Sequence, residues 1–172
     1  MASRQEIPLE CLRQTEIDWL VRSGVIVPAM VNPVAVRATT GSSSHDGIFE
    51  SCREGDWWLA FEQDDDTVFW QPRQCTLARD CGRAFALGED VIDRAATYAF
   101  DCRLNIFADP LEWLRASRDG IVVLDWSRAF DRLRDCLRIA IAEALLPTYR
   151  LHMQPGRLPD LYVTPSRRRA VA

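Results

Sequence analysis

Lysine is absent from this chain of 172 residues: the 21 basic side chains are all arginine, and aspartate outnumbers glutamate among the 25 acidic ones. The absence excludes mechanisms that need a lysine amine, such as Schiff-base catalysis and phosphate binding by a P-loop. A composition rich in arginine and aspartate is typical of a GC-rich coding sequence. It therefore points to a high-GC bacterium or to one of its mobile elements.

Histidine and long apolar runs are also scarce. The two histidines, His45 and His152, leave little material for histidine-dependent catalysis. No apolar run approaches the length of a membrane span, and the acidic residues near the N-terminus are incompatible with a signal peptide, so we expect a cytoplasmic protein. The formal net charge of −4 argues against a protein whose main role is to coat nucleic acid or a membrane surface.

The cysteines form no C-x-x-C pair, and their spacing fits no structural zinc motif. A zinc site built from Cys52, Cys75 and Cys81 with a histidine is therefore disfavoured. In a cytoplasmic protein of this length we expect reduced thiols that are mostly buried as small apolar side chains. The six are Cys11, Cys52, Cys75, Cys81, Cys102 and Cys136.

The pattern along the chain predicts a single α+β domain over residues 1–165. Residues 8–23 have a helical pattern, either as one helix or as two short helices separated near Gln14–Thr15, that Gly24 can end. Residues 25–27 are predicted as a short buried strand. An antiparallel meander then follows, and the C-terminal half alternates helices and strands. Residues 166–172 are predicted to form a disordered, arginine-rich tail.

The clearest strand signal lies between residues 56 and 71, where two alternating runs flank an acidic turn. Pairing Phe61 with Val68 sets Leu59 opposite Trp70 and places these side chains, with Trp57, on one core face. Further strands are expected at 34–38 and 47–51. The polar stretch 39–46 is expected to be a loop between them.

The C-terminal half carries its own signals. A helical pattern covers residues 88–100, and a strand is expected at 104–107. Asp109, followed by Pro110 and Glu112, is a helix start, and the helix should end before Gly120. Residues 121–124 resemble a strand buried on both faces. A helix with an apolar stripe from Trp126 to Leu137, a strand at 137–142 and a helix at 143–153 complete the pattern.

Two segments, IDWLVRSGVIVPA and DPLEWLRASRDGIVVLDWSRA, resemble a group of uncharacterised alphaproteobacterial proteins associated with plasmids, prophages and other mobile elements. The segments carry structural rather than catalytic residue types. The resemblance therefore implies a setting on mobile DNA, and it implies no activity and no residue roles.

Candidate catalytic and metal-binding residues each have an ordinary explanation. Residues 42–46 contain serine, histidine and aspartate, but neighbours in an extended loop point apart and form no triad. Two acidic clusters could hold a divalent cation, although they equally fit a solvated turn and the first turn of a helix. No cofactor and no metal ligand set is predicted. The clusters are Asp64, Asp65 and Asp66, and Glu89, Asp90 and Asp93.

The opposite face of the predicted hairpin is too apolar for open solvent, because it carries Trp58 and Phe69 where a one-sided sheet has polar residues. Either a helix after residue 88 covers this face, or Trp58 and Phe69 form a docking surface for a protein partner or a second copy.

The function expected from these observations is that of a non-catalytic, cytoplasmic protein-binding protein of a bacterial mobile element, which inhibits or modulates a host or rival system. One alternative is a DNA-associated accessory protein that binds phosphate through Arg167, Arg168 and Arg169. A second alternative is a metal-dependent enzyme.

Overall fold

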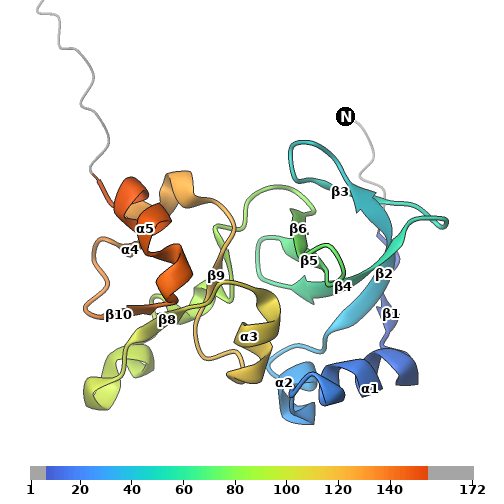
Figure 1. The fold of residues 1–172 in the computed structure, drawn as a ribbon, viewed down its shortest axis with the longest axis horizontal. Coiled ribbons are helices and arrows are strands. Elements are labelled where there is room, and N and C mark those ends of the chain that lie inside the picture. The colour runs from blue at the N-terminus through green and yellow to red at the C-terminus, as the bar shows by residue number, and fades with distance from the viewer. Residues whose placement is uncertain (1–6, 155–172) are drawn as a thin grey trace, which may run out of the picture.

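A computed structural model describes residues 7–154, and the predicted arginine-rich tail lies outside them. The described part confirms the α+β class (Figure 1). Its strands are β1 (Glu10–Cys11), β2 (Arg37–Ser43), β3 (Phe49–Ser51), β4 (Asp56–Glu62), β5 (Thr67–Gln71), β6 (Thr76–Arg79), β7 (Ala86–Leu87), β8 (Leu104–Ile106), β9 (Val122–Val123) and β10 (Ile139–Ile141). Its α-helices are α1 (Gln14–Arg22), α2 (Val27–Val31), α3 (Pro110–Arg115), α4 (Ala129–Leu133) and α5 (Leu146–His152). Its 3-10 helices are η1 (Glu89–Val91), η2 (Ala95–Asp101), η3 (Trp126–Arg128) and η4 (Glu143–Leu145).

The N-terminal half is a curved antiparallel sheet with the order β1-β2-β4-β5-β6, and β3 pairs with β2. The predicted hairpin is confirmed, since Phe61 lies opposite Val68 and Leu59 lies opposite Trp70. The strand expected at 34–38 lies at β2 instead, so most of the expected loop 39–46 is strand.

The sheet curls until its two edges meet. Ile48, just before β3, forms a bridge with Arg79 at the end of β6, and the backbone N–H of Arg79 donates to the carbonyl of Gly47 at 2.9 Å. The result is a small barrel, defined here as β2 to β6 (Figure 1). Gly41 permits this closure, because a Cβ at that position would lie 2.4 Å from the Phe49 ring.

The outer face of the barrel forms the main core. Leu59, Phe61, Val68 and Trp70 are buried there, as predicted, and Trp57 packs partly buried beside them. Residues of α1, α2 and α3 cover this face, among them Leu20, Met30 and Trp113.

The C-terminal half contains a small mixed sheet. β10 pairs in parallel with β8, Ile106 of β8 bridges to Ile121, and β9 pairs antiparallel with β7. Side chains alternate across the β7–β9 pair: Leu87 and Val122 belong to the main core, whereas Ala86 and Val123 belong to a second cluster under α4 and α5. The expected burial of strand 121–124 on both faces is thereby confirmed, and this strand joins the two cores.

Two predictions in the N-terminal segment are wrong. Residues 8–13 are not helical, because β1 pairs with β2, whereas a helix does begin at Gln14, where the two-helix alternative places the second one. Residues 25–27 are not a buried strand. Gly24 turns the chain at φ +89, and Pro28 then occupies the first turn of α2, where its missing N–H costs nothing.

Residues 88–100 do not form the predicted helix and contain η1 and η2 instead. Side-chain hydroxyls donate to carbonyls that would accept backbone N–H groups in a continuous helix. Thr97 donates to the carbonyl of Val91, and Tyr98 donates to the carbonyl of Ile92. Leu137 is likewise not part of an apolar stripe, because α4 ends at Leu133 and leaves Leu137 exposed.

The helix start at Asp109 is confirmed, since its carboxylate accepts hydrogen bonds from the backbone N–H groups of Leu111 and Glu112. Within residues 7–154, no helix is both long enough and apolar enough to cross a membrane.

Candidate functional site

Trp58 and Phe69 are not exposed, so neither can be the predicted docking surface. Both are buried, and the indole N–H of Trp58 donates to the carbonyl of Gly41 at 3.0 Å. The expected alternative, a covering helix after residue 88, is wrong as well. The two side chains lie inside the barrel with Phe49, Ala60 and Ala78.

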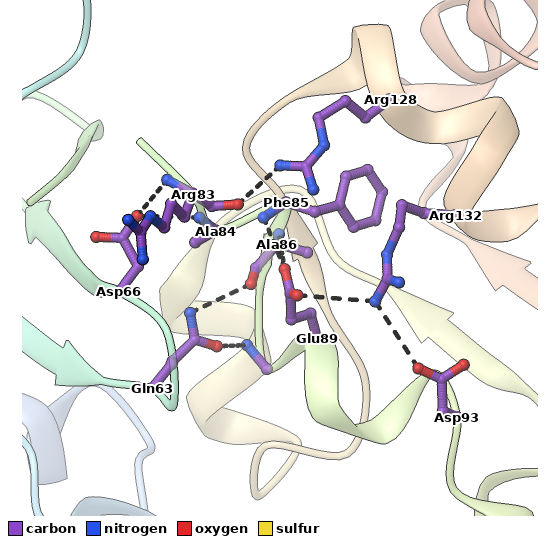
Figure 2. Close-up of polar contacts among 11 residues, drawn as sticks. Gln63, Asp66, Arg83, Ala84, Phe85, Ala86, Glu89, Asp93, Arg128 and Arg132 are labelled. Atoms are coloured by element: carbon purple, nitrogen blue, oxygen red, sulfur yellow. Dashed lines mark hydrogen bonds and ion pairs between the residues drawn. The ribbon is translucent and has the colours of Figure 1, made fainter. Parts of the chain in front are cut away.

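Asp66 is not a solvated turn residue. It is only 6% exposed, and the backbone N–H groups of Arg83 and Ala84 donate to its Oδ2 (Figure 2). The N–H groups of Thr67 and Cys81 donate to its Oδ1. Burial acts to raise the pKa of Asp66, but the hydrogen bonds from Ala84, Cys81 and Arg83 outweigh it and hold the pKa below its usual 3.8. The carboxylate therefore organises the loop after β6.

Glu89 and Asp93 are also engaged by the protein itself. Glu89 accepts hydrogen bonds from the N–H groups of Phe85 and Ala86, at 2.6 and 3.2 Å. Arg132 lies 3.7 Å from Glu89 and 3.8 Å from Asp93, between the two carboxylates (Figure 2). Among residues 7–154, no group of three or more histidine, cysteine or acidic side chains is placed to hold a metal ion. Glu89 and Asp93 thus connect the η1 segment to α4 through Arg132.

These contacts border a groove of about 780 Å³ between the β4–β5 hairpin and the segment from η1 to α4. Gln63 of the hairpin spans it, accepting from Gly88 and donating to the carbonyl of Ala86. Seven acidic residues and four arginines line it, so the groove offers no continuous basic track for a phosphate backbone. Its charged residues are Glu62, Asp64, Asp65, Asp66, Arg83, Glu89, Asp90, Asp93, Arg94, Arg128 and Arg132.

The serine, histidine and cysteine residues considered for catalysis or metal binding do not come together in one site within the described residues. The Ser44 hydroxyl accepts a hydrogen bond from Ile48 in its own loop, and His45 is exposed beside it. His152 lies on α5, next to Trp126. The expectation of mostly buried cysteines is wrong, because Cys11, Cys52, Cys75 and Cys102 are exposed and the other two are half-buried. Arg167, Arg168 and Arg169 lie outside the described residues.

The structure instead exposes an apolar surface that includes Ile26 and Val27, which the predicted buried strand 25–27 would place in the interior. No charged residue occurs between Arg22 and Arg37. Within this run, Val27 is 56% and Val31 50% exposed, and their spacing of four places them on one side of α2. The surface, called here the α2 surface, consists of the exposed residues Ile26, Val27, Pro28, Val31, Asn32, Pro33 and Val34.

Two arginines of the α3 region hold the ends of this segment. Arg115 donates from Nε to the carbonyl of Ser23 at 2.6 Å, and Arg118 donates from Nη1 to the carbonyl of Val34 at 2.8 Å. Burial lowers the pKa of Arg118 to about 10, so its guanidinium stays charged at neutral pH. Within the described part of the chain, neither arginine forms an ion pair with a carboxylate.

The signal for the α2 surface was present in the sequence as an uncharged run interrupted by two prolines. Residues 25–27 fit the pattern of a buried strand, and only the packing shows which side chains of the run remain outside.

Comparison with protein-family models, with curated protein sequences and with solved structures found no match.

Proposed function

We propose that this protein is a non-catalytic, cytoplasmic protein-binding protein, and that the α2 surface is where its partner docks. The observation that supports this proposal is the exposure of Ile26, Val27, Val31 and Val34 within one uncharged segment. Contiguous apolar surface is costly to leave in water and typically marks an interaction site.

Charge indicates the chemistry of the partner. Arg115 and Arg118 border the α2 surface and have no carboxylate partner among the described residues. A complementary partner presents an apolar patch flanked by aspartate or glutamate, whose carboxylates accept hydrogen bonds from the exposed guanidinium of Arg115. In the mobile-element setting that the sequence resemblance implies, such a partner belongs to a host or rival system.

Binding is favoured over catalysis because the carboxylates best placed for acid–base or metal chemistry are already occupied. Asp66 and Glu89 accept hydrogen bonds from backbone N–H groups, and Arg132 lies against Glu89 and Asp93. Calorimetric titration with magnesium, manganese and zinc tests this point. Stoichiometric binding of any of the three would favour the metal-dependent enzyme instead.

The docking surface is tested with a double variant, Val27→Asp with Val31→Asp, because both side chains are exposed and the change adds charge without opening the core. Leu151→Asp is the matched control, since Leu151 is an exposed apolar residue on α5. Proteins retained by the wild type and the control, but not by the double variant, are then purified and titrated directly against the protein.

We expect a purified partner to bind the wild type, to bind the double variant at least tenfold more weakly, and to lose affinity with Arg115→Glu. Equal affinity for the wild type and the double variant would overturn the assignment of the surface. So would the absence of any directly binding partner. A change of oligomeric state in the double variant would reassign the α2 surface to contacts between copies of this chain.

A further inference from the structure

We propose that two copies of this chain associate through β10, whose free edges pair antiparallel across a two-fold axis at Ala140. This surface is distinct from the α2 surface, and the proposal does not depend on the proposed function.

The first observation is the hydrogen-bonding direction of β10. Leu104 donates to the carbonyl of Arg138, and the N–H of Ala142 donates to the carbonyl of Ile106. In a parallel ladder with this register, Ala140 directs both of its backbone groups toward β8. The N–H and C=O groups of Ile139 and Ile141 therefore point away from β8, and no described residue pairs with them.

An unpaired edge of this kind is a template for another strand, and proteins usually protect it with charge, proline or a covering element. β10 contains neither a charged residue nor a proline, since its sequence is Ile-Ala-Ile followed by Ala142. All three of its residues are half-buried. The outward N–H and C=O groups of Ile139 and Ile141 are therefore available to pair with another strand.

The second observation is that this edge is self-complementary. When two copies pair antiparallel about Ala140, Ile139 faces Ile141 of the second copy, and both residues direct their N–H and C=O groups toward the partner. They can exchange both hydrogen bonds, while the two Ala140 residues form the closer, non-hydrogen-bonded pair with Cα atoms about 4.5 Å apart. The two small mixed sheets then become one continuous sheet, and the interface is isologous.

The third observation is the charge at the two ends of the strand. Arg138 precedes β10 and Glu143 follows it, and both are exposed. Antiparallel pairing about Ala140 sets Arg138 opposite the uncharged Ala142 of the second copy, whereas parallel pairing would bring the two Arg138 residues together. Arg138 keeps its contact with Asp101, at 2.7 Å through Nη1.

The fourth observation is exposed apolar surface next to this end of β10. Phe100 is fully exposed, at 101%, and Leu137 is 74% exposed. They neighbour Asp101 and Arg138 in the chain, and the ion pair between those residues joins the two segments that carry the apolar side chains. Backbone pairing over three residues buries too little area for a stable dimer, which needs roughly 800 Å² per partner. Phe100 and Leu137 supply the apolar contact that such an interface requires.

The test is the mass of the full chain in solution, measured by light scattering and sedimentation at several concentrations. We expect a dimer for the wild type. Ala140→Lys and Ala140→Glu should each be monomeric, because both copies would place like charges directly opposite each other. An equimolar mixture of the two variants should recover the dimer through Lys–Glu pairs, which also shows that neither variant is misfolded.

Phe100→Ser and Leu137→Ser should each raise the dimer dissociation constant at least threefold, whereas Leu151→Asp should leave it unchanged. A wild type that is monomeric at several hundred micromolar, or an Ala140→Lys variant that dimerises as the wild type does, would overturn the proposal. A dimer that Val27→Asp disrupts and Ala140→Lys does not would also overturn it. Loss of partner binding in the α2 surface variants, with the dimer intact, leaves this proposal standing and concerns the proposed function alone.

Discussion

The ring of Phe49 stacks on the ring of Phe69, with centroids 4.0 Å apart and planes inclined by 13°. Phe49 also meets Trp58 edge-on at 5.5 Å. These contacts fill the interior of the barrel and explain why an apolar second face of the hairpin needs neither a covering helix nor a partner.

Replacing Phe49 with alanine should lower the free energy of unfolding by about 3–5 kcal/mol, because the substitution leaves a cavity inside the barrel. Denaturant titration followed by tryptophan fluorescence measures the effect. Leu151→Ala is the matched control and should change stability by less than about 0.5 kcal/mol, since Leu151 is 69% exposed. Similar effects for the two variants would contradict the barrel closure.

Asp66→Asn should destabilise the protein by about 1–3 kcal/mol at pH 7, because Arg83 and Ala84 lose the oxygen that accepts their N–H groups. Asp64→Asn is the control, since Asp64 is exposed on the same turn.

The destabilisation caused by Asp66→Asn should depend on pH. The pKa of Asp66 is lowered in the folded protein, so its charge stabilises the fold above the unfolded pKa near 3.8. This contribution is lost as the pH falls from 3.8 through the lower folded pKa. The stability difference between the wild type and Asp66→Asn should therefore shrink in acid, and a difference independent of pH between 7 and 2 would refute the assignment.

Ser117→Gly should stabilise the protein by about 0.5–1 kcal/mol. Ser117 has φ +57 at the end of α3, where its N–H donates to Leu114 and the N–H of Arg118 donates to Trp113. This hydrogen-bond pattern favours glycine, because a side chain is strained in the left-handed region. Thermal unfolding should show a higher midpoint for Ser117→Gly and a lower one for Ala116→Gly, one residue earlier at a negative φ.

The cysteines should react with a thiol reagent in two groups. Cys11, Cys52, Cys75 and Cys102 are exposed, so four thiols should react without denaturant, and Cys81 and Cys136 should react more slowly. Denatured, non-reduced protein should titrate close to six free thiols. Two or more disulfides in freshly purified protein would contradict the cytoplasmic assignment.

Several features of the fold could be predicted from residues that lie close together in the chain. The alternation of Leu59 and Phe61 with Val68 and Trp70, across a short acidic turn, determines the hairpin register. The carboxylate of Asp109 reaches N–H groups only two and three residues away, so its capping role needs no tertiary information.

The candidate sites were less predictable, because each depends on groups brought together from distant parts of the chain. The apolar pattern of Trp58 and Phe69 is compatible with a docking surface, a covered face or a barrel interior. Pattern alone cannot choose among these, since all three require the same residue types. Likewise, the sequence alone is compatible with Asp66 as a ligand of a cation or as an acceptor of backbone hydrogen bonds. The structure decides, because the N–H groups of Cys81, Arg83 and Ala84 donate to its carboxylate.

The amino-acid sequence by itself determined the α+β class, the central hairpin and the helix start at Asp109, because alternation and capping act over a few residues. Only the tertiary structure decided that Trp58 is inside and Val27 outside, although both belong to apolar runs. The physical reason is that burial depends on which other surface covers a side chain. Phe49 and the bridge from Ile48 to Arg79 close over Trp58, while no described residue buries the exposed side of α2.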